Sequence, residues 1–176
     1  MSTTRILLLG VLLDEPMNGY RVRRRLEAMG ADGWANVAFG SIYHGLSKMA
    51  DEGLLEVVES GRGGKTVYQI TEQGRLEFQR LLTLAWYQVQ PIVDPFQVAL
   101  SFMHLLPKED LIGGLQARID HQKRSIAAID GIFGRKQQYG APRHVDENLR
   151  LTIGMIAAQL AWAEQALKKV ESGELP

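Results

Sequence analysis

The feature that most constrains the fold is a short change of hydrophobic period near residue 54. Most of the chain repeats its apolar residues at intervals of three and four, as helices do. Residues 54–59 and 66–70 instead form short β-branched runs, separated by a segment that contains three glycines, Arg62 and Lys65. This pattern predicts a hairpin with a flexible, basic tip. Because three predicted helices precede the hairpin, the order is that of a winged helix-turn-helix.

The helices of this first region have recognisable starts and ends. Residues 4–13 are apolar on nearly every face and predict a buried helix. Asn18 is expected to cap a second helix that reaches about residue 29. A third helix should run from Gly40 to Gly53, since glycine favours a helix end. Thr71 should cap a fourth helix after the hairpin, continuing to about residue 86.

The third helix has two different faces. At 100° per residue, Ile42, Leu46 and Met49 form one stripe that is expected to be buried. The opposite stripe is small and polar and contains Ser41, His44, Gly45, Lys48 and Glu52. A helix of this kind can pack on a core and still present hydrogen-bonding side chains outward.

Two prolines divide the chain. Pro91 and Pro95 bracket a break, so we predict domains at residues 1–88 and 89–176. Helices are predicted at about 96–106, 108–138 and 145–170, the last two forming an antiparallel hairpin. The predicted fold is therefore mainly α with a small β-hairpin: an N-terminal winged helix-turn-helix and a C-terminal antiparallel helical dimerisation domain.

The last helix carries the signal for dimerisation. Its apolar residues recur at spacings of four and three, and small residues beside them would let another helix come close. This surface predicts a homodimer. The predicted interface residues are Leu149, Ile153, Ile156, Leu160 and Leu167.

Composition narrows the function classes. The chain has 176 residues, with 20 lysines and arginines against 20 aspartates and glutamates, and each half is neutral. The absence of cysteine excludes disulfides, cysteine zinc sites and thiol catalysis, and predicts a cytoplasmic protein. The apolar run at residues 6–13 is too short to span a membrane, and Asp14-Glu15-Pro16 follows it in place of a signal cleavage site.

No enzyme or metal site is predicted. Gly64-Lys65-Thr66 resembles the end of a phosphate-binding loop, but Glu59 stands where that motif needs glycine. The four histidines are scattered and lack metal-ligand spacing. We find no nucleophile–base pair, and therefore predict a non-enzyme without cofactor.

Three ordered motifs resemble one family. They are the run Leu8-Leu9-Gly10-Val11-Leu12 followed by Pro16-Met17-Asn18-Gly19-Tyr20; Gly40-Ser41-Ile42-Tyr43 with Leu46 and Glu52-Gly53-Leu54; and Tyr68-Gln69-Ile70-Thr71-Glu72-Gln73-Gly74-Arg75. Together they resemble PadR-family transcriptional regulators. The resemblance implies a cytoplasmic, homodimeric protein that binds double-stranded DNA, most often a repressor released by a small molecule. The wing departs from the family, because relatives usually have a proline and more cationic residues after the Gly-Arg.

Seven residues are candidates for DNA contact: Tyr20, Ser41, Tyr43, His44, Lys48, Arg62 and Lys65. Ser41 at the helix start suits a phosphate, His44 and Lys48 suit base edges or backbone, and the two wing residues suit flanking phosphates or the minor groove. Each has a structural alternative. Ser41 is equally suited to capping, and the two tyrosines to helix packing. The arginines at 21–25 more readily form intrahelical pairs with acids such as Glu15 and Glu27.

A second set of residues suggests an effector pocket. Aromatic and methionine side chains gather near the domain junction and on the last helix: Trp86, Phe96, Met103, Met155 and Trp162, with Tyr87 and Phe102 beside them. They are candidates for binding a small aromatic effector. The alternative is that they form core and dimer interface. At the level of function, the alternatives are a protein–protein interaction module and a regulator without effector.

Overall fold

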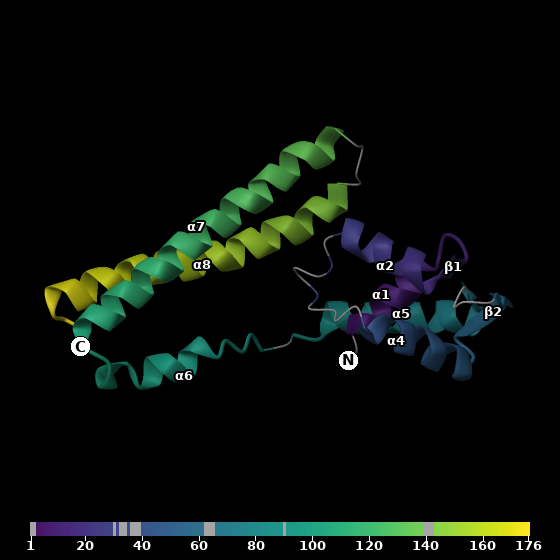
Figure 1. Cartoon of the computed structure of the whole chain (residues 1–176), viewed down its shortest axis with the longest axis horizontal. Helices are drawn as coiled ribbons and strands as arrows, with labels where there is room; N and C mark the ends of the chain where they lie inside the picture. Colours follow the sequence, from purple (N-terminus) through teal and green to yellow (C-terminus); the bar gives the residue numbers. More distant parts are fainter. Residues whose placement is uncertain are drawn as a thin grey trace. The chain divides into compact units, whose positions relative to one another are not determined.

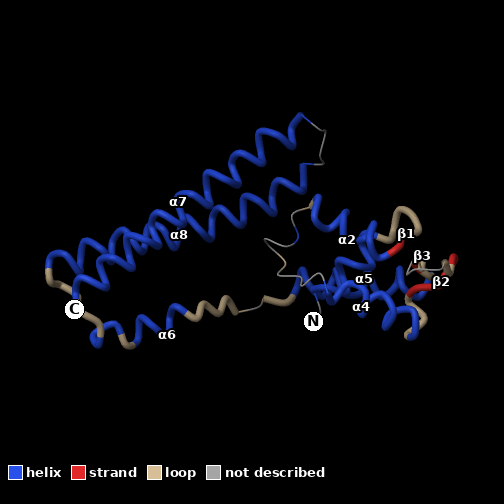
Figure 2. The backbone as a smooth tube through the Cα atoms, viewed as in Figure 1, coloured by secondary structure: helices blue, strands red, loops and turns tan. Residues whose placement is uncertain are grey.

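The computed structural model describes residues 3–29, 31, 35, 40–61, 66–89, 91–138 and 143–176. The chain divides into two compact units, Met1–Pro91 and Ile92–Pro176. Figure 1 shows the elements of each unit, and Figure 2 shows that the strands are confined to one small region of the N-terminal unit. We describe each unit by itself.

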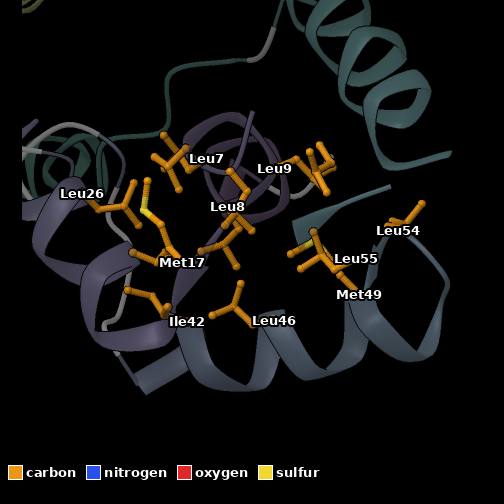
Figure 3. Close-up of a cluster of buried hydrophobic side chains, with 14 of the residues drawn as sticks. Leu7, Leu8, Leu9, Met17, Leu26, Ile42, Leu46, Met49, Leu54 and Leu55 are labelled. Carbon is orange, nitrogen blue, oxygen red and sulfur yellow. The ribbon is translucent and has the colours of Figure 1, made fainter. Parts of the chain in front are cut away.

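The N-terminal unit is built around α1 (Thr3–Val11). Around it lie α2 (Gly19–Ala28), α4 (Gly40–Asp51) and α5 (Glu72–Tyr87). Leu8, Leu9 and Leu12 are almost fully buried, and Figure 3 shows leucines of α1 pointing into one cluster with Ile42 and Leu46 of α4. The predicted stripe of α4 is confirmed, since Ile42, Leu46 and Met49 are all buried. Its polar side therefore faces outward.

The β-structure is a three-stranded antiparallel sheet. Strands β2 (Leu55–Glu59) and β3 (Val67–Ile70) form the predicted hairpin. Strand β1 (Met17–Asn18) adds to the other edge of β3, giving the order β1-β3-β2. The prediction of a hairpin alone was thus incomplete. Two residues are too few to show an alternating pattern, so only the pairing reveals this strand.

A tight junction joins α4, β2 and α5. Gly53 ends α4 with a φ of 75°, which glycine adopts without strain, as predicted. Thr71 caps α5 by accepting a hydrogen bond from the Gly74 N–H at 3.0 Å, and its own hydroxyl donates to the Gly53 carbonyl at 2.8 Å. A Cβ built on Gly74 would lie 2.1 Å from the Leu54 carbonyl oxygen. The first turn of α5 therefore packs directly on the backbone of Leu54.

The C-terminal unit is helical. It contains α6 (Phe96–Ser101), a 3-10 turn (Met103–Leu105), α7 (Lys108–Gln138) and α8 (Arg143–Ser172). Helices α7 and α8 run antiparallel side by side, as predicted (Figure 1). The single helix expected over 96–106 is wrong. Pro107 forces Leu106 into an extended conformation, with ψ 145°, and the preceding turn tightens into 3-10 geometry.

The seam between α7 and α8 is mostly apolar. Leu111, Leu115 and Ile119 of α7 are buried with Ala163, Ala166 and Val170 of α8. Gln122 continues the stripe of α7 and is also buried, with 6% of its surface exposed. It donates a hydrogen bond to the Gln159 side chain of α8 at 3.3 Å. One polar pair thus interrupts the hydrophobic seam.

Two classes of feature are not found in the described part of the chain. None of its helices is both long and apolar enough to cross a bilayer. Across the same residues, no three histidine, aspartate or glutamate side chains gather in a way that could hold a metal ion.

The Gly74 junction gives a first testable prediction. Gly74→Ala should lower the free energy of unfolding by about 2–4 kcal/mol, because the methyl group meets a backbone oxygen that cannot move alone. Gly113→Ala is the control, since nothing lies within 4 Å of a Cβ at that helical position. It should be neutral or slightly stabilising. Urea unfolding followed by circular dichroism measures both. Equal stability of the two variants would contradict the close approach.

Candidate nucleic-acid interface and a cavity in the C-terminal unit

The outward side of α4 presents the polar residues that the sequence singled out. Ser41, His44 and Lys48 are all exposed. They lie along a hollow of about 270 Å³ that is also lined by Thr4 and Arg5 of α1. The buried stripe on the other side holds the helix in place, so these side chains project from a rigid support. Such a face can offer hydrogen bonds and positive charge to an anionic partner.

The two tyrosines occupy the other edge of this face. Tyr20 of α2 is 63% exposed and Tyr43 of α4 is 50% exposed. The Tyr43 ring nevertheless packs on the α2 backbone, since a Cβ on Gly19 would lie 2.6 Å from it. Tyr43 therefore combines a packed ring with an accessible edge. The packing role and the contact role weighed in the sequence are compatible for this residue.

Arg23 of α2 is a further candidate for DNA contact, which the sequence analysis did not include. Its Nε donates to the Glu27 carboxylate at 2.7 Å. This hydrogen bond is the main reason why the pKa of the Arg23 guanidinium is raised above its ordinary value, and Tyr43 and Tyr20 add smaller contributions. Arg23 thus lies on the exposed side of α2, three residues after Tyr20 on the same helix. One signal was available in the sequence: residues 20 and 23 are separated by three positions on one helix.

The remaining arginines of α2 are paired with acids. Arg21 pairs with Glu15 at 2.8 Å and Arg25 with Asp14 at 2.6 Å. Arg24 pairs with Glu27 at 3.4 Å. The predicted pairing with Glu15 and Glu27 is confirmed. These exposed pairs add little to stability, but they offset the positive charge of α2.

The wing candidates lie outside the described residues. Arg62 and Lys65 fall in the segment between β2 and β3 that the structure does not describe. Both residues stay predictions.

The C-terminal unit contains an apolar cavity of about 300 Å³ between α6, α7 and α8. Three of the predicted effector residues, Phe96, Met103 and Trp162, line it. The Phe96 and Trp162 rings meet edge to face, with centroids 5.7 Å apart. Trp86 and Met155 are not among the lining residues, and Trp86 is 84% exposed in the N-terminal unit. The structure thus gathers part of the predicted set.

The predicted dimer residues are partly buried within the chain itself. Leu149, Ile153 and Ile156 are half-buried within the chain, while Leu160 and Leu167 pack against the buried α7–α8 cluster. The larger exposed apolar residues of α8 are instead Leu151, Met155 and Trp162, which form a second stripe at spacings of four and seven. Leu160 and Leu167 thus contribute to the intrachain seam, and the dimer role of all five residues stays a prediction. Periodicity alone cannot tell which neighbour covers a stripe.

Comparison with protein families decides what the N-terminal unit is. Residues 8–80 match the model of the transcriptional regulator PadR-like family. The N-terminal unit is a PadR-like domain. The match covers the described helices α2 and α4, the sheet and the start of α5, and it confirms the family resemblance of the three sequence motifs.

Solved structures extend the likeness to the whole chain. Bacillus subtilis PadR in complex with operator DNA is 19% identical, with a TM-score of 0.77, over 97% of this chain and 98% of that chain. The same protein in complex with p-coumaric acid gives 0.78 at 19% identity, over 96% and 99%. The Vibrio cholerae virulence activator AphA gives 0.74 at 22% identity, over 96% and 98%. These structures share the fold, which confirms the winged helix. A search of curated protein sequences found no significant match.

The packing of Tyr43 can be separated from its hydroxyl. Tyr43→Ala should lower the free energy of unfolding by about 1–2 kcal/mol, because the ring leaves the Gly19 backbone. Tyr43→Phe keeps the ring and should change stability by less than about 0.5 kcal/mol. Thermal unfolding of the full chain measures both. If the alanine variant were as stable as the phenylalanine variant, the packing role would be refuted.

Proposed function

We propose that this protein is a sequence-specific DNA-binding transcriptional regulator that acts in the cytoplasm. The observation that carries the proposal is the outward face of α4, with Ser41, His44 and Lys48 exposed on a helix whose other face is buried in a PadR-like domain. A helix of this kind fits the major groove, where side chains read base edges. Tyr43 of α4 and the α2 residues Tyr20 and Arg23 are suited to contact backbone phosphates next to the groove.

The charge distribution predicts how the protein selects its site. The formal net charge is zero, and the arginines of α2 are paired with acids. Because general attraction to DNA comes from net positive charge, we expect weak non-specific binding. Affinity would then depend on a few well-placed residues, including Arg62 and Lys65 of the wing, and on having two copies.

We further propose that the regulator is a homodimer on a palindromic operator. The supporting observation is the second stripe of α8, where Leu151 and Met155 are exposed beside the small residues Gly154, Ala158 and Ala161. Small residues allow a second helix to approach closely, and burial of the stripe would stabilise the pair. Two reading helices could then reach successive major-groove turns about 34 Å apart.

The direction of regulation is proposed as repression that a small molecule relieves. The cavity lined by Phe96, Met103 and Trp162 supports a ligand site. Among the structural neighbours, one PadR structure contains p-coumaric acid, and AphA is described as an activator. A protein-docking module or a regulator without effector would leave this cavity without a role.

A binding assay tests the proposal. Operator fragments are selected from genomic DNA, and affinity is measured by fluorescence anisotropy at several salt concentrations. Lys48→Ala and Arg62→Ala should each weaken binding by about ten-fold or more and reduce the salt dependence by about two ions per dimer. Both variants should leave the dimer intact. Lys168→Ala, an exposed lysine of α8, is the matched control.

Two outcomes would contradict DNA recognition. The assignment fails if both variants bind as the unaltered protein does. It also fails if no fragment is enriched, or if binding lacks salt dependence, which is the result expected of a protein-docking module.

The dimer proposal has its own test. The double variant Leu151→Glu, Met155→Glu should be monomeric at micromolar concentration, because two charges would be buried in the contact. Ala157→Glu, an exposed position on another side of α8, is the control and should remain dimeric. Analytical ultracentrifugation measures the mass. If the double variant remained a dimer, the contact would be formed by another face of α8 or by another part of the chain, and the proposed interface would be wrong.

A further inference from the structure

The cavity of the C-terminal unit continues into a polar end at Arg118. This residue lines three hollows that share their walls. One is the apolar chamber with Phe96 and Trp162, and another contains Gln122 and Gln159. The third is lined by residues of both. An apolar space and a polar space therefore meet at one guanidinium.

Gln122 carries an unsatisfied acceptor at this polar end. Its side-chain nitrogen donates to Gln159, but its Oε1 has no hydrogen-bond partner although the residue is only 6% exposed. A buried acceptor without a donor is unfavourable, and native proteins rarely keep one without a reason. The residue also occupies a position of the α7 stripe that an apolar side chain would fill. The Gln122 Oε1 atom is therefore available to accept a hydrogen bond from a bound molecule.

Arg118 is similarly under-used. Its guanidinium carbon lies 3.4 Å from the centre of the Phe96 ring, a cation–π contact. It forms an ion pair with Asp94 at 3.7 Å, which is longer than a charge-assisted hydrogen bond. The other Asp94 oxygen accepts from the Phe96 N–H at 2.9 Å. No hydrogen bond from Arg118 to another described residue is present, so beside its long ion pair with Asp94 its N–H groups can donate to a ligand carboxylate.

The spacing of the two groups limits the ligand. Arg118 and Gln122 are four residues apart on α7, which is about 6 Å along a helix axis. Their side chains can converge on neighbouring atoms of one small molecule. A free ammonium group is disfavoured there, because it would lie next to the guanidinium. The donor for Gln122 should therefore be neutral.

We propose that this groove binds a small carboxylic acid that carries an apolar side chain and a neutral hydrogen-bond donor next to its carboxylate. The apolar group occupies the chamber beside Trp162, the carboxylate binds Arg118, and a hydroxyl or amide N–H donates to Gln122 Oε1. 2-Hydroxy acids and N-acyl amino acids share this chemistry. Only the role of this molecule as an effector rests on the proposed function. Binding of the molecule to the groove does not depend on DNA.

Isothermal titration calorimetry of the full-length protein tests the site with three probes. 3-Phenyllactate has all three features, 3-phenylpropanoate lacks the hydroxyl, and the methyl ester of 3-phenyllactate lacks the charge. We expect 3-phenyllactate to bind at least ten-fold more tightly than either of the others, as hydrogen bonds to charged or buried groups require. Equal binding of all three, or no binding of any, overturns the proposal.

Variants assign the contacts. Arg118→Gln should weaken 3-phenyllactate ten-fold or more and leave the ester unchanged, whereas Arg124→Gln, an exposed arginine of the same helix, should change neither. Gln122→Leu should remove the preference for the hydroxyl, so that 3-phenyllactate and 3-phenylpropanoate bind equally. If the preference persists, Gln122 only sets the register of the α7–α8 seam, and the proposed contact is wrong.

The same experiments separate this site from its regulatory role. If 3-phenyllactate binds as expected but leaves operator affinity unchanged, the ligand site stands and the effector role fails. If the probe fails to bind the dimer but binds the monomeric Leu151→Glu, Met155→Glu variant, a second copy of the chain covers the groove and the proposal is overturned.

Discussion

Burial of α1 against α4 fixes the surface on which the proposed function depends. Leu8 and Leu9 pack with Ile42 and Leu46 in a core that leaves them almost no exposed surface. Because one stripe of α4 is held there, its opposite stripe must face outward. The exposure of His44 and Lys48 is therefore a consequence of core packing. A helix held in this way can meet DNA without first losing conformational freedom.

The C-terminal unit uses the same principle with one exception. Its seam is apolar except at Gln122, whose amide is paired on one side only. An apolar residue would be expected to stabilise this seam better. The cost of the glutamine becomes understandable if the unsatisfied oxygen binds a ligand next to Arg118. Stability and recognition would then compete at one residue.

The sequence predicted the secondary structure well where local signals are strong. Asn18 and Thr71 cap their helices, and α7 begins and ends at the predicted residues. It missed β1, which is two residues long and exists only through its pairing with β3. The sequence also predicted one helix where the structure has α6 followed by a 3-10 turn. For the site, it identified the outward residues of α4 but missed Arg23, because the proximity of Tyr43 to α2 is a tertiary fact.

The sequence by itself determined the order of elements, the break near Pro91 and Pro95, and the two-sided character of α4. These features follow from local propensity and periodicity, which act over a few residues. Only the tertiary structure decided which apolar stripe of α8 is covered within the chain and which stays exposed. It also decided that Arg118, Gln122 and Phe96 share one groove. A periodic pattern specifies that a face will be buried, whereas its partner depends on packing between segments far apart in the chain.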